Sequence, residues 1–220
     1  MTIYIVAPLN RDVDKMKKMI LTITLLLCWI PLSSLANEEW IAGAYAKSFD
    51  YEQRENHRQA IHSLARIYEQ YPKGYTVNLR LGWLHYLLGK YANSIEHYRV
   101  AIQSYPNAAE PKLGLMLPLL VQLKYEEVVI TANQIIRDDP YNYFANLRLT
   151  IALKAQGKTE SALAVANKML AQYPTDTVFI EHAAVCQELL GNKELAIALF
   201  QGLHILDPDS QTALQFLSNK

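Results

Sequence analysis

The chain has 220 residues, of which 51% are hydrophobic and 19% are charged, and these proportions are typical of folded proteins. Its 21 Lys and Arg residues balance its 21 Asp and Glu residues, so the formal net charge is zero. A neutral chain without a basic run lacks the electrostatic footprint of nucleic-acid binding and adsorbs poorly to an anionic membrane. We therefore expect no nucleic-acid partner.

The first segment in chain order is an apolar run at residues 19–32, which follows three lysines at 15–18. Small residues come next and end at Ala36. This order predicts a secretory signal peptide at residues 1–36, cleaved after Ala36, and hence a periplasmic or secreted protein that meets the membrane only before cleavage. The apolar run of about 14 residues is short for a spanning helix, which needs about 20. The alternative is an uncleaved segment that anchors the protein to the membrane.

Residues 1–15 precede this pattern and include Pro8, Asp12 and Asp14 without a clear order of their own. Met16 begins the sequence Met-Lys-Lys-Met-Ile-Leu, which is a usual start for a signal peptide. Our hypothesis is that translation begins at Met16.

The two cysteines are separated by the predicted cleavage. Cys28 lies in the apolar run, so the mature chain keeps Cys186 as its one thiol and forms no internal disulfide. Cys186 stands among apolar residues of a helical segment, and we expect it to be a small core residue.

Five of the nine prolines recur at a fixed interval of 34 residues, at Pro72, Pro106, Pro140, Pro174 and Pro208. A period between about 20 and 50 residues indicates an array of repeated supersecondary units. With each proline at position 32, the array in residues 37–220 consists of repeats 41–74, 75–108, 109–142, 143–176 and 177–210, followed by residues 211–220.

Other repeat positions agree with a helix–turn–helix unit, whose helices we call A and B. Position 20, where two helices cross closely, holds mainly small residues: Ala60, Ser94, Val128, Ala162 and Ala196. Position 15 is glycine in three repeats, at Gly89, Gly157 and Gly191, and glycine readily takes the left-handed conformation that closes a helix.

The best repeat reads Asn78-Leu79-Arg80-Leu81-Gly82, then Gly89-Lys90-Tyr91, then Ser94, Tyr98, Ala101 and Pro106. With this unit, residues 41–210 resemble the tetratricopeptide repeat family. The resemblance implies an all-α, right-handed superhelical solenoid of five repeats whose concave side is lined by the A helices. It also implies a scaffold that binds other proteins. Residues 211–220 are expected to form a short capping helix.

Two repeats depart from the pattern. The first is degenerate, with Lys47 at position 7 and Glu55 at position 15, as terminal repeats of an array often are. The third has Pro118 inside helix A. An interior proline removes a backbone hydrogen bond, so we predict a kink or an early break at this point.

The resemblance places positions 2, 5, 6, 9, 12 and 13 of helix A on the concave face. These positions define a candidate peptide-binding groove at Tyr45, Phe49, Arg80, Trp83, Tyr86, Leu117, Phe144, Arg148 and Ile151. Apolar side chains with spaced arginines suit a peptide or helix that carries apolar residues and a carboxylate. The alternative is that both arginines pair with local carboxylates and that the aromatic residues only pack on a neighbouring helix.

The sequence offers no motif for a catalytic, cofactor or metal site. The six histidines form no i, i+4 pair, and no phosphate-binding loop or nucleophile elbow occurs. We therefore expect a non-enzymatic scaffold or adaptor of the bacterial cell envelope, with no cofactor and no metal, that binds a peptide or helix of a partner protein. The alternatives are a self-associating spacer of an envelope assembly, which would be a homo-oligomer, and an accessory subunit of an enzyme.

Overall fold

The computed structural model describes residues 32–218, which form helices joined by short turns and contain no strand. The proposed start at Met16 and nearly all of the predicted signal peptide lie outside the described residues. Helix α2, Leu32–Gln53, continues through Ala36, after which cleavage is predicted. Among the described residues, no helix is long and apolar enough to cross a membrane.

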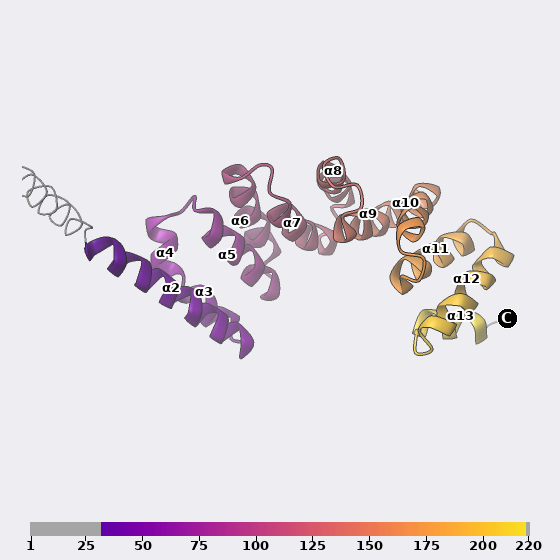
Figure 1. Ribbon diagram of the computed structural model, residues 1–220, viewed down its shortest axis with the longest axis horizontal. Helices are drawn as coiled ribbons and strands as arrows, with labels where there is room; N and C mark the ends of the chain where they lie inside the picture. The colour runs from indigo at the N-terminus through magenta and orange to yellow at the C-terminus, as the bar shows by residue number, and fades with distance from the viewer. Residues whose placement is uncertain (1–31, 219–220) are drawn as a thin grey trace, which may run out of the picture. The chain divides into compact units, whose positions relative to one another are not determined.

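The chain divides into two compact units, residues 1–47 and residues 48–220. The described part of the first unit is the N-terminal portion of α2. The second unit contains the end of α2 and all later helices, and from α5 onward each helix packs mainly against its neighbours along the chain. The expected all-α solenoid of helical hairpins is therefore confirmed (Figure 1).

The hairpins follow the 34-residue period. The helices after α2 are α3 (His57–His62), α4 (Ala65–Gln70), α5 (Tyr75–Leu87), α6 (Tyr91–Ser104), α7 (Ala109–Val121), α8 (Tyr125–Ile136), α9 (Tyr143–Ala155), α10 (Thr159–Gln172), α11 (Thr177–Leu189), α12 (Lys193–Leu206) and α13 (Gln211–Ser218). Helices α5, α7, α9 and α11 each occupy positions 1–13 of a repeat, so they are A helices. Helices α6, α8, α10 and α12 are the corresponding B helices.

Every turn between helix A and helix B uses a left-handed residue at position 15. Gly89, Gly157 and Gly191 have φ of 69°, 73° and 79°, and Glu55 and Leu123 both have φ of 58°. The residue after each of them donates its N–H to a carbonyl five residues earlier, as in the bond from Lys90 to His85. This closure is the same in all five repeats, although two of them use a residue for which a positive φ is unfavourable.

The core lies where the small residues at position 20 allow helices to approach closely. All five of these residues are fully buried. The hydroxyl of Ser94 donates to the carbonyl of Gly82 at 2.7 Å, which satisfies this polar side chain inside the core. The position-27 residues Ile67, Ala101, Ile135, Met169 and Leu203 are also buried. The repeat pattern therefore predicted the close helix packing at position 20 correctly.

Buried asparagines at position 4 connect successive repeats. The amide of Asn78 donates to the carbonyls of Pro72 and Gly74, and Asn146 makes the equivalent bonds to Pro140 and Asn142. These bonds link the turn that joins helix B to the next helix A to the first turn of that helix, beside the backbone bonds that the carbonyls of Gly74 and Asn142 also accept.

The first repeat differs from the others in its second helix. In the later repeats, positions 17–30 form one helix, although α8 ends two residues early. In the first repeat the same positions form two helices, α3 and α4, which are separated at Ser63 and Leu64. The hydroxyl of Ser63 donates to the carbonyl of Gln59 at 2.9 Å at this break. The irregularity agrees with the degenerate sequence of this repeat.

Helix α7 shows that Pro118 causes no early break. The helix continues to Val121, the same position at which the other A helices end. Pro118, Met116 and Leu119 are all buried, so packing holds the helix together despite the missing N–H. The alternative outcome, a kink, stays a prediction.

The C-terminal helix α13 begins where helix A of a further repeat would begin. Ser210 accepts a hydrogen bond from the N–H of Ala213 at 3.4 Å, and Ala213 is fully buried. Phe216 stacks on Phe200 of α12 with ring centroids 4.2 Å apart. The expected capping helix is therefore present.

Candidate protein-binding face

The nine predicted groove residues lie on four A-type helices. Tyr45 and Phe49 lie on α2, Arg80, Trp83 and Tyr86 on α5, Leu117 on α7, and Phe144, Arg148 and Ile151 on α9. Phe49 and Phe144 are 51% and 53% exposed, which is unusual for phenylalanine in an ordered helix. Arg80 is buried, and the other six are partly buried.

Arg80 is at the centre of a polar cluster that joins the end of α2 to α5. Its guanidinium group forms an ion pair with Glu52, and its Nε donates to the Ser48 hydroxyl at 3.2 Å. The ring of Phe49 lies 4.0 Å from the guanidinium carbon. Arg80 thus pairs with a local carboxylate, which is the alternative interpretation that the sequence left open.

Glu52 also accepts a hydrogen bond from the indole N–H of Trp83 at 2.6 Å. Trp83 in turn stacks on Tyr86, with ring centroids 5.7 Å apart and an interplanar angle of 29°. Phe49, Arg80, Trp83 and Tyr86 therefore form one continuous group, which we call the N-terminal aromatic cluster. Glu52 completes it, and its place at position 12 of the first repeat is one of the groove positions that the resemblance implies.

Arg148 forms a second, separate contact on α9. It donates to the backbone carbonyl of Leu113 in the preceding helix A, and its guanidinium carbon lies 5.5 Å from the centre of the Phe144 ring. Burial lowers the pKa of Arg148 from its ordinary value. The two predicted arginines thus belong to different clusters, and position 6 of the repeat between them is Gly114. Leu117 and Ile151 are partly buried on α7 and α9.

A third polar contact joins α9 to α11. Lys154 donates to Nδ1 of His182 at 3.2 Å. Burial, and secondarily the charge of Lys154, lower the pKa of His182 to about 4, so the ring is neutral at pH 7. Cys186 is fully buried nearby, and burial raises the pKa of its thiol. Cys186 is therefore the core residue that the sequence predicts.

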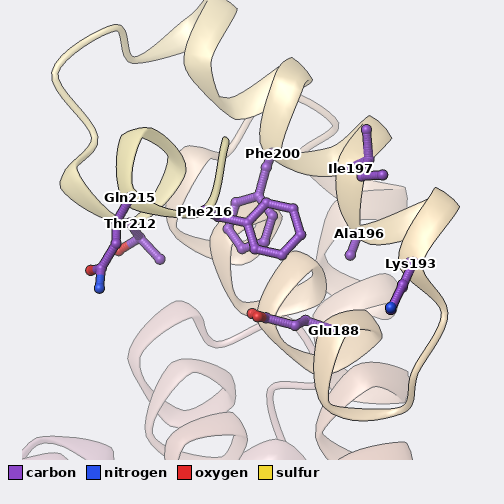
Figure 2. Close-up of a pocket in the computed structure, with 8 residues that line it drawn as sticks. All are labelled: Glu188, Lys193, Ala196, Ile197, Phe200, Thr212, Gln215 and Phe216. Carbon is purple, nitrogen blue, oxygen red and sulfur yellow. The ribbon is translucent and has the colours of Figure 1, made fainter. Parts of the chain in front are cut away.

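A cavity of about 600 Å³ lies at the end of the described chain, between α11, α12 and α13. Figure 2 shows the stacked rings of Phe200 and Phe216 at its centre, with Thr212, Gln215 and Glu188 around them. Because α13 ends at Ser218, it does not cover the beginning of α12 as a full helix A would. The sequence prediction missed Thr212 and Gln215, although extending the 34-residue period past residue 210 assigns them to groove positions 2 and 5.

Within residues 32–218 as far as they are described, no three His, Cys, Asp or Glu side chains lie close enough to hold a metal ion. The clusters on the A helices consist of ion pairs, hydrogen bonds and stacked rings. Aromatic rings and arginines are residue types that are common in recognition surfaces.

Comparisons with known proteins agree with the fold. Models of the tetratricopeptide repeat match residues 45–109 and 144–176. No curated protein matches the chain. The chain therefore contains tetratricopeptide repeats and has the architecture of a tetratricopeptide-type interaction scaffold.

Three solved structures illustrate the structural similarity. MamA 41-end from Desulfovibrio magneticus RS-1 superposes with a TM-score of 0.72 at 14% identity, covering 78% of this chain and 97% of that chain. MamA MSR-1 superposes with a TM-score of 0.65 at 22% identity, and the match covers 76% of this chain and 96% of that chain. YrrB, described as a TPR protein with an unusual peptide-binding site, superposes with a TM-score of 0.68 at 14% identity. This match covers 78% of this chain and 88% of that chain. At these identities the similarity concerns the fold alone.

Proposed function

We propose that this protein is a non-enzymatic adaptor of the bacterial cell envelope that holds a peptide or helix of a partner protein against its A helices. The observation that carries the proposal is a repeated pairing of an exposed phenylalanine with an arginine. Phe49 lies against Arg80, and Phe144 lies against Arg148, yet both rings remain more than half exposed. Aromatic residues and arginine are the types that most often dominate protein interfaces.

The pairing suits a partner segment with apolar side chains. A phenylalanine ring held against a guanidinium group loses little conformational freedom when a partner covers it, so binding gains most of the benefit of burying the ring. YrrB, which shares the fold, is described as having a peptide-binding site, and this similarity supports the choice of a peptide or helix as the ligand.

The place of action in this proposal is outside the cytoplasm. It is supported by the lysines, apolar run and small residues at the N-terminus, which have the order of a secretory signal peptide. Fractionation of the native host and N-terminal sequencing of the mature protein test it. A mature N-terminus at Asn37 in the periplasmic fraction is the expected result, whereas a cytoplasmic protein that retains residues 1–36 would contradict it.

The binding face is tested by crosslinking the tagged protein in the native envelope fraction and identifying the partner. The variants are Phe49→Ala and Phe144→Ala, alone and combined, because both rings are exposed and their removal leaves the core intact. The double variant is expected to lose the partner that the wild type enriches while keeping its helical circular dichroism.

The matched control is Tyr173→Ala, which removes an exposed aromatic ring after helix B of the fourth repeat. The proposal is supported if the double variant no longer captures the partner while the control variant captures it as the wild type does. Equal capture by both variants would exclude this face. Recovery of the protein alone, with a mass that increases with concentration in sedimentation, would instead favour the self-associating spacer.

A further inference from the structure

A cavity of about 420 Å³ lies at the break in the first helix B, away from the residues of the proposed binding face. It lies among α3, α4, α5 and α6, and residues on both sides of the break line it, namely Ile61, His62, Ala65 and Tyr68. In the later repeats a single helix B passes this point. The cavity therefore accompanies the irregular helix of this repeat, and we call it the histidine cavity.

The cavity has an apolar floor and a cationic rim. Leu81 on its floor is buried, whereas Arg58 and Lys90 at its edge are exposed. Its lining contains no carboxylate among the described side chains. An apolar pocket of this size with a few convergent polar groups is typical of a small-molecule site, and its charge favours an anion.

Two stacked histidines form one wall of the cavity. His85 and His97 lie with ring centroids 5.2 Å apart and an interplanar angle of 7°, and the ring of Tyr68 meets His97 edge-on at 5.4 Å. Nδ1 of His97 donates to Oδ1 of Asn78 at 2.9 Å, because the amide nitrogen of Asn78 already donates to two carbonyls. This bond fixes the orientation of the wall and leaves flat aromatic faces beside the cavity.

The second histidine has an unmet polar atom. His85 is only 9% exposed, and its Nδ1 is buried without a hydrogen-bond partner. Such an atom is unfavourable, and because it has almost no accessible surface, a molecule in the cavity meets the ring of His85 and not this nitrogen. Burial, then the charges of His97 and Lys90, lower the pKa of His85 to about 4, so the ring is neutral at pH 7 and forms an uncharged part of the wall.

We propose that the histidine cavity binds a small aromatic carboxylate, with its ring against His85, His97 and Tyr68 and its carboxylate toward Arg58 and Lys90. The flat walls select a planar body, and the cationic rim without a carboxylate selects a negative charge. A metal ion does not suit the cavity, since its histidines form no group of three ligands within the described chain. This binding is independent of the proposed role of the A helices.

The probe is phenylacetate, titrated into the full chain at pH 7 by isothermal titration calorimetry and by NMR of the histidine ring protons. We expect saturable binding, with shifts confined to the rings of His62, His85 and His97. Phenethylamine, which has the same ring and a positive charge, is expected to bind at least about tenfold more weakly. Equal affinity for phenylacetate and phenethylamine would overturn the proposal.

The double variant Arg58→Gln with Lys90→Gln tests the rim, and both side chains are exposed, so the fold is preserved. We expect it to weaken phenylacetate binding by at least about tenfold. Lys158→Gln is the matched control, because Lys158 occupies position 16 of its repeat, as Lys90 does, and precedes an unbroken helix B. Equal affinities in the double variant and the wild type would contradict the assignment of the rim.

The same chemistry occurs in a free aromatic acid and in the carboxyl terminus of a peptide that ends in phenylalanine. Parallel titrations with phenylacetate and with Ala-Ala-Phe distinguish these sources. Tighter binding of the tripeptide assigns a peptide terminus, and tighter binding of phenylacetate assigns a free acid. Failure of both phenylacetate and Ala-Ala-Phe to bind would overturn the proposal. A crosslinking result that excludes the A helices as the partner-binding face would leave the proposed ligand site unaffected.

Discussion

The ring of Tyr98 fills the space that a side chain on Gly114 would need: a Cβ atom on Gly114 would lie 2.3 Å from Cε1 of Tyr98. Tyr98 projects from helix B of the second repeat, and Gly114 is at position 6 of the third. Arginine holds that position in the repeats on either side, at Arg80 and Arg148. The buried tyrosine ring thus takes the place of a side chain at position 6, and it does so only because Gly114 has none.

The first prediction follows from this contact. Gly114→Ala forces the buried ring of Tyr98 to move, and overpacking of this kind costs about 1–3 kcal/mol of unfolding free energy. Urea unfolding followed by circular dichroism measures the loss. Gly202→Ala is the control, because Gly202 lies in α12 with nothing within 4 Å of an added Cβ. The control is expected to raise stability by about 0.5–1 kcal/mol, and a gain in both variants would contradict the steric argument.

The second prediction concerns the turn of the third repeat. Leu123 has φ of 58° and is 67% exposed, so its side chain contributes little packing while its backbone is strained. Leu123→Gly is expected to stabilise the protein by about 1 kcal/mol, measured as a shift of the urea midpoint at constant slope.

The reciprocal variant is Gly157→Ala at the same position of the fourth repeat, where φ is 73°. It is expected to destabilise the protein by a similar amount. Opposite signs in the two variants are the expected result, and a loss of stability in Leu123→Gly would show that the leucine packs favourably in the turn.

The third prediction separates a buried ion pair from an exposed one on the same helix. Glu52→Ala leaves the buried guanidinium group of Arg80 without its carboxylate and frees the indole N–H of Trp83. We expect a loss of about 2–3 kcal/mol, because an unpaired buried charge is costly and Glu52 is partly solvated. Asp50→Ala breaks the exposed pair with Arg54 and is expected to cost under about 0.5 kcal/mol. Thermal unfolding of both variants decides between these values, and equal losses would contradict the importance of the buried pair.

The fourth prediction is a dependence of stability on pH through His182. Its pKa is about 4 in the folded chain, against an ordinary value of 6.5 when unfolded. Between pH 6.5 and 4 the unfolded chain therefore binds more protons, so the free energy of unfolding falls as the pH falls through this range. One pKa unit corresponds to about 1.4 kcal/mol, and partial exposure of the ring reduces the effect to about 2 kcal/mol in total.

His182→Gln removes this titration and is expected to reduce the fall in stability between pH 6.5 and 4, as measured by urea unfolding at several pH values. Part of the fall remains, because the pKa of His85 is also lowered to about 4. His62→Gln, which changes an exposed histidine, is the control and should keep the wild-type slope. Identical slopes in all three proteins would show that His182 does not carry the dependence.

The regular parts of the fold were predictable because a solenoid depends on local contacts. From α5 onward each helix packs mainly on its neighbours along the chain, so one proline every 34 residues was sufficient to predict where α5, α7, α9 and α11 begin. The outcome at Pro118 was less predictable. An isolated helix would lose a hydrogen bond there, whereas the buried neighbours of Pro118 compensate for it in the folded chain.

The candidate face was predictable as a set of positions but not as a set of partners. The family resemblance selected the positions of Phe49, Arg80 and Phe144, and the two phenylalanine side chains are exposed. Spacing within one helix says nothing about which side chain of the preceding repeat reaches a given residue. Glu52 meets Arg80 across the interface between two repeats, and only the packed structure shows this pair.

The sequence by itself determined the class of fold, the repeat boundaries and the small residues of the core, because these depend on a short period and on local helix geometry. The tertiary structure decided the ion pair at Arg80, the packing of the Tyr98 ring into the space beside Gly114, and the cavity beside the broken helix of the first repeat. Each of these depends on how side chains of neighbouring repeats fill a shared volume, and a periodic pattern contains no information about that volume.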